Sequence, residues 1–316
     1  MHFCAGLAGV SIRQYTTDPT TLADCVVRYY DTFRPHAVWM SADTWVNAEA
    51  MGVKVGFPDD NQPMCGLGDP LVKTPGDIDR IKSPDLAQGR WPRMLDALQQ
   101  LRRRLGNEVF IVACFDQYPF SLACAAMGVD QFMLRLLDDR PFAEALLDKC
   151  TTFTTTYAQA LGAAGADMLS GGDSPAGLLG PKLYHEVALP YEKRAIEEIK
   201  SSYAGPVSLH ICGNATPMLV DMSRSGADVL ELDHQVDLAT ACQAIEPQVA
   251  IWGNLDPVGV LARGNPEMVR QATCDALSAT RASNRRRFVL SSGCTLAMET
   301  PAENLHALIQ AARQFH

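Results

Sequence analysis

Three side chains of types that bind transition metals stand at two places in the chain. His210 and Cys212 are separated by a single residue, and Cys294 lies far downstream. Residues two apart on a β-strand point to the same side, so a strand through His210 would present both donors on one face. Zinc prefers imidazole and thiolate ligands, and a catalytic zinc site uses three protein ligands and keeps one position open. These residues therefore predict a Zn2+ site formed by His210, Cys212 and Cys294.

Each of these residues taken singly has a simpler interpretation. A histidine at a strand end is more often a hydrogen-bonded structural residue, and a cysteine is more often a small buried hydrophobe. The combination of three favours the metal. Elsewhere the chain has no Cys-x-x-Cys pair, which argues against a structural zinc ribbon. His234 is a competing ligand, and we expect it instead to contact substrate at the rim of the site.

The elements that must position these ligands can be read from a repeated pattern. Short apolar runs alternate with amphipathic helical stretches, which is typical of βα units around a parallel sheet. Apolar continuity within each run suits strands that are buried on both faces. The predicted strands cover residues 36–40, 109–113, 166–169, 207–211, 227–232, 249–252 and 288–291.

Seven strands of this kind predict a single (β/α)8 TIM barrel over residues 1–316, with a short or truncated first strand ahead of Gly6. A doubly wound open sheet is the alternative. The barrel is favoured because no Gly-x-Gly-x-x-Gly loop follows the first strands.

Functional groups of a β/α barrel lie at the carboxyl ends of its strands and in the loops that follow. Asp116 and Gln117 stand at such a strand end. Acidic residues there also cap the next helix, and for Asp256, which precedes a proline, capping and function have equal weight. The residues that we expect to contact substrate are Asp43, Glu49, Tyr118, Asp173, Asn214, Asp233, His234, Asn254 and Asp256.

Composition excludes some classes of protein. The formal net charge is -9, and no basic stripe is present, so nucleic-acid binding is not expected. The sequence shows neither a signal peptide at Met1 nor an apolar run long enough to span a bilayer. We therefore expect a cytoplasmic protein without a membrane partner, whose ten cysteines are thiols or metal ligands and not disulfides.

Several motifs resemble the uroporphyrinogen decarboxylase superfamily, and within it the zinc-dependent methylcobamide:thiol (coenzyme M) methyltransferases. The resemblance spans nearly the whole chain. Its landmarks are Ala42-Asp43-Thr44, Gly172-Asp173-Ser174, Pro190-Tyr191-Glu192, His210-Ile211-Cys212-Gly213-Asn214, Gly253-Asn254-Leu255-Asp256-Pro257 and Ser292-Gly293-Cys294.

The resemblance implies a (β/α)8 barrel with zinc on His210, Cys212 and Cys294. It also implies transfer of a methyl group between a methylcorrinoid and a thiol or tetrahydrofolate acceptor. Zinc would activate the acceptor, so no separate general base is assigned, and Glu231 is a possible fourth ligand in the resting state. The chain lacks the Asp-x-His-x-x-Gly signature of a cobalamin-binding module, so we expect a separate corrinoid protein as partner.

Two alternatives stay open. A cofactor-free decarboxylase of the uroporphyrinogen type would use an arginine-bearing segment near the first strand, where this chain has only Arg13. A non-catalytic barrel that binds a metal or a corrinoid would keep the ligands without the reaction.

Overall fold

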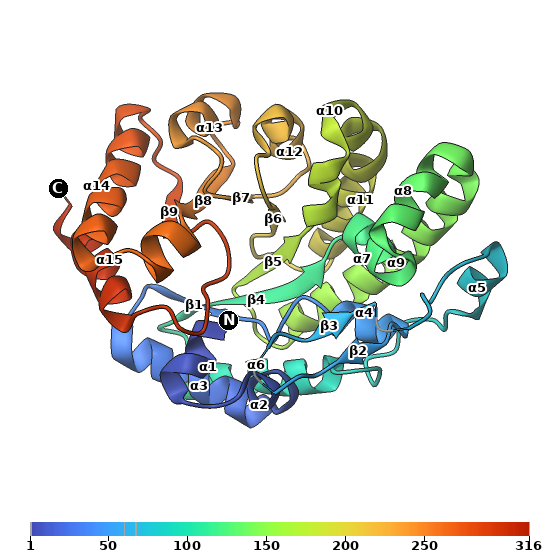
Figure 1. The fold of residues 1–316 in the computed structure, drawn as a ribbon, viewed down its shortest axis with the longest axis horizontal. Helices are drawn as coiled ribbons and strands as arrows, with labels where there is room; N and C mark the ends of the chain where they lie inside the picture. The colour runs from blue at the N-terminus through green and yellow to red at the C-terminus, as the bar shows by residue number, and fades with distance from the viewer. Residues whose placement is uncertain (1, 60, 67, 316) are drawn as a thin grey trace.

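A curled parallel sheet, covered on its outer face by helices, forms the fold (Figure 1). The structure, a computed structural model, describes residues 2–59, 61–66 and 68–315. Within these residues the sheet has seven strands in the order β1-β4-β5-β6-β7-β8-β9, and every neighbouring pair is parallel. The strands are β1 Ala37–Met40, β4 Phe110–Gln117, β5 Met168–Gly172, β6 Ser208–Ile211, β7 Val229–Leu232, β8 Ala250–Leu255 and β9 Phe288–Ser292.

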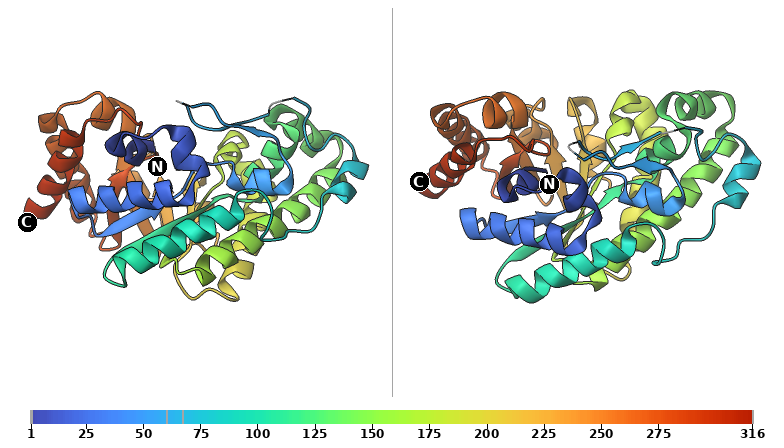
Figure 2. Two further views of the ribbon diagram at one scale, coloured as in Figure 1. Left: turned by 90° about the horizontal axis from the view of Figure 1, so that it is seen from below. Right: turned by 60° about the horizontal axis from the view of Figure 1, so that its bottom comes forward.

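Helices follow most of the strands and lie around the outside of the sheet, as the turned views show (Figure 2). Four further segments, η1 to η4, form short 3-10 or π turns. The α-helices are α1 His2–Ala8, α2 Ile12–Thr17, α3 Pro19–Phe33, α4 Val46–Met51, α5 Pro75–Arg80, α6 Trp91–Leu105, α7 Pro119–Met127, α8 Val129–Asp138, α9 Arg140–Ala163, α10 Gly180–Leu183, α11 Leu189–Lys200, α12 Leu219–Ser223, α13 Leu238–Ala244, α14 Pro266–Ala282 and α15 Ala302–Gln314.

All seven predicted strands are confirmed, and they form the parallel sheet of a barrel-type α/β fold. The barrel is open between β1 and β9, which do not pair with each other. The sheet curls into a half-barrel whose two edges are β1 and β9. A first strand ahead of Gly6 is not found among the described residues, because residues 2–8 form helix α1. Gly6 leaves no room for a side chain there, since it packs against the backbone of Met298 in the loop between β9 and α15.

A small antiparallel ribbon was not predicted. Strands β2 (Val55–Gly56) and β3 (Met64–Cys65) pair at the end of the sheet where β1 finishes. Each strand has two residues, too few for the alternation of apolar and polar side chains that marks a strand in a sequence.

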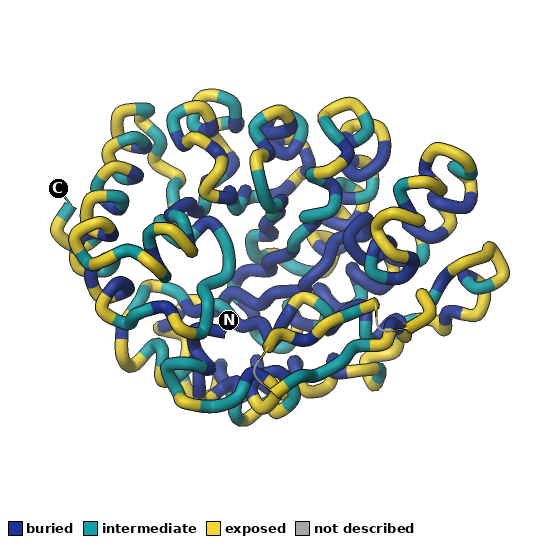
Figure 3. Tube along the Cα trace, viewed as in Figure 1, coloured by how far each residue is buried: buried dark blue, intermediate teal, exposed yellow. Residues whose placement is uncertain are grey.

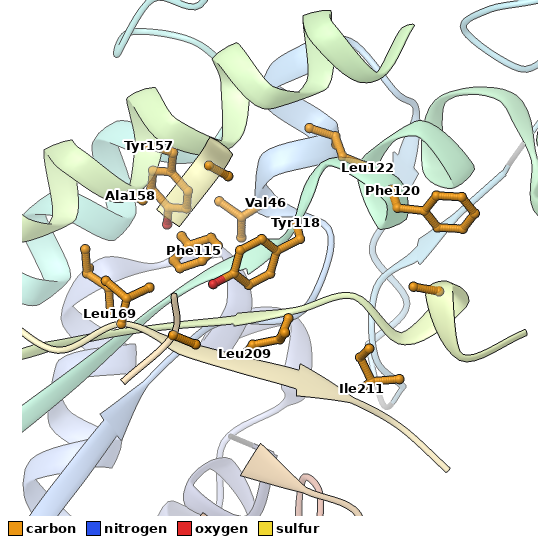
Figure 4. Packing of buried hydrophobic residues seen from close by; sticks show 14 of the residues in the cluster. Val46, Phe115, Tyr118, Phe120, Leu122, Tyr157, Ala158, Leu169, Leu209 and Ile211 are labelled. Atoms are coloured by element: carbon orange, nitrogen blue, oxygen red, sulfur yellow. The ribbon is translucent and has the colours of Figure 1, made fainter. Parts of the chain in front are cut away.

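The strands and the inner sides of the helices are mostly buried (Figure 3). The core between the sheet and its helices is built from large apolar side chains (Figure 4). Phe115 and Tyr118 are fully buried, and their rings meet edge to face with centroids 5.1 Å apart. Together these rings fill the space where Gly171 of β5 would otherwise carry a side chain. Because the carboxyl ends of β4 and β5 are packed in this way, the residues that follow them are held in fixed positions.

No single helix among the described residues has both the length and the apolar character needed to cross a membrane. The pair α7 and α8 passes that test only when joined, with a bend of 107° between them.

A buried cation connects the first strand loop to helix α6. The Arg90 side chain is 2% exposed, and its guanidinium lies 2.5 Å from Asp43 Oδ2 and 2.5 Å from Glu49 Oε2. The same group donates a hydrogen bond of 3.0 Å to the carbonyl oxygen of Thr16. Asp43 and Glu49, predicted to contact substrate, are therefore engaged in a structural ion-pair network.

Replacing Arg90 with leucine removes the charge that compensates two carboxylates, one of them fully buried. We expect the free energy of unfolding to fall by about 3–5 kcal/mol in urea titration, the usual effect of breaking a buried ion pair from one side. The matched control is Arg93→Leu, because exposed Arg93 makes one hydrogen bond, to the carbonyl of Thr17. An equal decrease in the unfolding free energy of the two variants would show that the Arg90 ion pairs do not stabilise the fold more than one exposed hydrogen bond does.

Candidate metal centre

Curvature of the sheet brings three metal-binding side chains together. Strand β9 is three strands away from β6 in the sheet, a separation of about 14 Å if the sheet were flat. In the curled sheet, the donor atoms of His210, Cys212 and Cys294 all lie within 4.8 Å of one another. His210 Nε2 and Cys212 Sγ are 3.0 Å apart. The structure thus gathers the three predicted ligands at the carboxyl ends of the strands.

The ring of His210 is oriented by its neighbouring strand. Its Nδ1 lies 2.9 Å from the carbonyl oxygen of Glu231 on β7, in register with His210 across the two strands. An Nδ1–H that donates to this carbonyl leaves the Nε2 lone pair for a metal, the usual arrangement behind histidine ligands.

Two further contacts hold Cys212. Ser174, just after β5, donates its hydroxyl proton to Cys212 Sγ at 3.0 Å. Gly213 follows with a φ of 81°, a left-handed conformation that glycine adopts without strain. The Gly213 N–H donates to Asp233 Oδ2 at 2.9 Å, so the turn after Cys212 is fixed from β7 as well. The role of Ser174 was not predicted, although its position shortly after a predicted strand could have indicated it.

Hydrogen bonds and charges within the group shift the pKa values of all three side chains. A hydrogen bond from Cys294, aided by one from Ser174, lowers the pKa of Cys212 to about 7. The same Cys212 contact, together with burial, raises the pKa of Cys294 to about 12. Burial alone would lower the pKa of His210, but Cys294 and the charge of Glu231 outweigh it and raise that pKa to about 9.

The donor set fits a zinc ion. One nitrogen and two sulfur donors at mutual distances within 4.8 Å can share a single ion, whose bonds to these atoms measure about 2.0–2.3 Å. Glu231, the possible fourth ligand, stands outside this group: its Oε1 accepts a hydrogen bond of 2.7 Å from Ser170 and another from Ser208. Its charge nevertheless acts on His210.

The metal-binding group opens onto a large cavity inside the curled sheet. The cavity measures about 1450 Å3 and reaches from the three ligands to the amino ends of the strands, where Ala37, Phe110 and Phe288 line it. Among the described residues that line it are Asp116, Gln117 and Glu231, but none of the nine side chains that we expected to contact substrate.

Four of those nine side chains have structural partners in the interior or at its edge. Asp43 and Glu49 bind Arg90, as described above. Tyr118 is fully buried and donates its phenol proton to the carbonyl of Ser208 at 2.8 Å. Asp173 is also fully buried and accepts the N–H of Ser121 at 2.6 Å.

Four of the other five lie on the loops after β6, β7 and β8, and Asn254 lies near the carboxyl end of β8. Asn214 and Asp256 accept backbone N–H groups of the turns that follow them. Asn254 is buried and donates to the carbonyls of Asp233 and Val236. His234 Nδ1 is 3.0 Å from Asp233 Oδ1, and its Nε2 is 3.9 Å from Asp256 Oδ2. In this structure these residues shape the rim, and substrate contact by them stays a prediction.

A curled α/β sheet with a His-Cys-Cys group at the carboxyl ends of its strands defines a barrel-type protein with a candidate metal centre. The sequence profile of the uroporphyrinogen decarboxylase (URO-D) family matches residues 2–315. The chain therefore belongs to the uroporphyrinogen decarboxylase (URO-D) family.

Relatives with different activities share this sequence pattern. A methylcobamide:CoM methyltransferase, MtbA, from Methanosarcina acetivorans is 33% identical over 281 residues, which cover 88% of this chain and 80% of the relative. A uroporphyrinogen decarboxylase from Crocosphaera subtropica is 26% identical and aligns over 96% of this chain and 85% of its own length. Among solved structures, a methyltransferase from Methanosarcina mazei is 25% identical with a TM-score of 0.87, and the match covers 99% of this chain and 90% of that one.

Replacing Cys294 with serine tests the metal-binding group. We expect zinc content to fall from about one ion per chain to well below that, because a hydroxyl is a much poorer zinc ligand than a thiolate. Metal analysis after dialysis measures this, with circular dichroism as a check on the fold. Cys274→Ser, in helix α14, is the matched control and should keep its zinc. Full occupancy in Cys294→Ser would remove Cys294 from the site.

A buried carboxyl pair behind the site predicts a pH effect on stability. Burial raises the pKa of Asp173 from 3.8 to about 7, and fully buried Glu192 beside it has its pKa raised well above the usual range, again by burial. A raised pKa means that the folded protein binds this proton more tightly than the unfolded chain does. The stabilisation is therefore complete below pH 3.8 and is lost as the pH rises through about 7.

Asp173→Asn keeps an oxygen for the Ser121 N–H but has no proton to lose. We expect its unfolding free energy to change less than that of the wild type as the pH rises through 7, by urea titration at several pH values. Exposed Asp130→Asn serves as control and should follow the wild type. Parallel pH curves for Asp173→Asn and the wild type would contradict the assignment.

Proposed function

We propose that this protein is a zinc-dependent methyltransferase that moves a methyl group from a methylated corrinoid to a thiol. The observation that carries the proposal is the group of one imidazole and two thiol donors within 4.8 Å at the mouth of a cavity. The methylcobamide:CoM methyltransferase among the relatives supports the same reaction class.

A zinc ion on His210, Cys212 and Cys294 would leave a position for the acceptor sulfur and favour its thiolate form. The chain's own residues keep that position reactive. Two cysteine thiolates offset the charge of the ion, so the acceptor sulfur retains electron density. The hydroxyl of Ser174 holds Cys212 in place, and the carbonyl of Glu231 fixes the ring of His210.

The transfer balances without a redox partner. The thiol proton leaves to solvent when the acceptor binds, and a sulfur lone pair then forms the new bond to the methyl carbon. The cobalt–carbon bond breaks with its electron pair kept by cobalt, so methylcobalt(III) becomes cobalt(I) and the thiol becomes a methyl thioether.

We further propose that the corrinoid arrives on a separate protein that covers the carboxyl ends of the strands. Exposed apolar side chains on the segments that follow the strands support this. Leu178 in the turn after β5, Val220 in helix α12 after β6 and Val258 in the turn after β8 are 72%, 47% and 50% exposed. A thiol acceptor is favoured over tetrahydrofolate because a sulfur suits the donor set. All ten cysteines are free thiols, in keeping with a cytoplasmic setting.

The proposal is tested by incubating the zinc-loaded protein with methylcobalamin and 2-mercaptoethanol, coenzyme M, homocysteine or tetrahydrofolate. We expect the absorbance of methylcobalamin to change with at least one thiol and the rate to fall at least about tenfold after zinc is removed with a chelator. Turnover of uroporphyrinogen without metal would favour the decarboxylase alternative. Zinc binding without demethylation of methylcobalamin would favour a non-catalytic barrel. Activity with tetrahydrofolate but with none of the thiols would show that the acceptor is tetrahydrofolate and not a thiol.

A further inference from the structure

A second polar group faces the same cavity as the metal ligands. Asp116 and Gln117 end β4, and Ser121 lies in the first turn of α7. The three residues line the cavity and are 5%, 6% and 4% exposed. Asp116 also adopts a φ of 67°, a left-handed conformation that is uncommon for residues other than glycine.

Two atoms of this group lack a partner within the described part of the protein. Gln117 Oε1 and Ser121 Oγ are buried and make no hydrogen bond. Asp116 is fixed by the N–H of Asn47, which donates to Oδ2 at 3.1 Å. A buried polar atom without a partner costs about 1–3 kcal/mol, so two such atoms in residues that line a cavity favour a ligand that supplies their hydrogen bonds.

A single glycine separates this group from the metal ligands. Gly172 of β5 pairs with Gln117 on one side and with His210 on the other, so these two residues lie about 10 Å apart across the sheet. A Cβ on Gly172 would lie 3.6 Å from the carbonyl oxygen of Asp116 and 4.0 Å from His210 Cδ2. Glycine therefore leaves open the space between the two groups.

Near this wall, the described residues that line the cavity offer an anion no positive charge. Burial and the nearby charge of Asp43 raise the pKa of Asp116 well above its usual range, although Arg90 opposes this. Within the described residues, the lysine and arginine side chains that line the cavity are Arg34, Arg313 and Lys54. Arg34 precedes the amino end of β1, and Arg313 of α15 donates to the Arg34 carbonyl. Lys54 is exposed, and its charge acts on exposed Asp69.

We propose that Asp116, Gln117 and Ser121 bind the tail of the acceptor thiol, and that this tail donates hydrogen bonds and carries no negative charge. A hydroxyl or an ammonium group meets both conditions. The oxygens of the three side chains accept its protons, and Asp116 can ionise to pair with an ammonium. A sulfonate or carboxylate has only acceptor oxygens to offer to the unpartnered oxygen of Gln117. The inference rests on the proposed function, since the thiol end of the molecule is placed at the metal ligands.

Three thiols with one carbon skeleton and different tails test the inference: 2-mercaptoethanol, cysteamine and coenzyme M, which end in a hydroxyl, an ammonium and a sulfonate. Their dissociation constants are measured by calorimetry on the zinc-loaded protein. We expect the first two to bind at least about tenfold more tightly than coenzyme M, the effect of leaving one buried acceptor without a partner. Tightest binding of coenzyme M would overturn the proposal.

Asp116→Asn is the matched variant, because asparagine tolerates a positive φ and keeps an oxygen for the N–H of Asn47. We expect cysteamine to lose at least about tenfold in affinity relative to coenzyme M, with zinc content unchanged. Lys54→Met should leave all three affinities as they are. The inference would be contradicted if the ratio of cysteamine affinity to coenzyme M affinity were the same in Asp116→Asn as in the wild type. Weaker binding of coenzyme M to Lys54→Met would also contradict it. Should the thiols bind in the expected order while methylcobalamin stays intact, the proposed function fails and the binding group stands.

Discussion

The metal-binding group depends on the register and the curvature of neighbouring parallel strands. Register explains the hydrogen bond between His210 and the carbonyl of Glu231. Register places the ring of His210 beside Glu231 and, on the other side, beside Gly172. Curvature then brings Cys294, three strands away, within 4.8 Å of the other two donors. Neither of the other two ligands is close to Cys294 in the sequence, so the site exists only when the sheet is folded and curled.

Much of this sheet could be predicted from the sequence, since strands buried on both faces appear as unbroken apolar runs and each is followed by a helical stretch. The rule that function lies at the carboxyl ends of strands then placed the ligands on one rim. Prediction failed where elements are very short or depend on distant contacts. Residues 2–8 became helix α1, which packs beside Met298, and the two-residue strands β2 and β3 carry no pattern.

The same limit explains the predicted substrate residues. The sequence shows that Asp43 and Asp173 follow strands, but not that Arg90 would pair with Asp43 or that Ser121 would bond to Asp173. A carboxylate at a strand end can cap, pair or bind substrate, and the choice depends on residues tens of positions away. Asp116 differs from Asp43 and Asp173, because it lines the cavity and its Oδ2 accepts the N–H of Asn47.

Zinc K-edge X-ray absorption of the purified protein, recorded before and after addition of a thiol, tests the central claim most directly. We expect one imidazole nitrogen, two sulfurs and one further light atom around the zinc ion before the thiol is added. With the thiol present, we expect the imidazole nitrogen and three sulfurs. A coordination shell without two sulfurs, or a sulfur count that does not rise with the thiol, would contradict it.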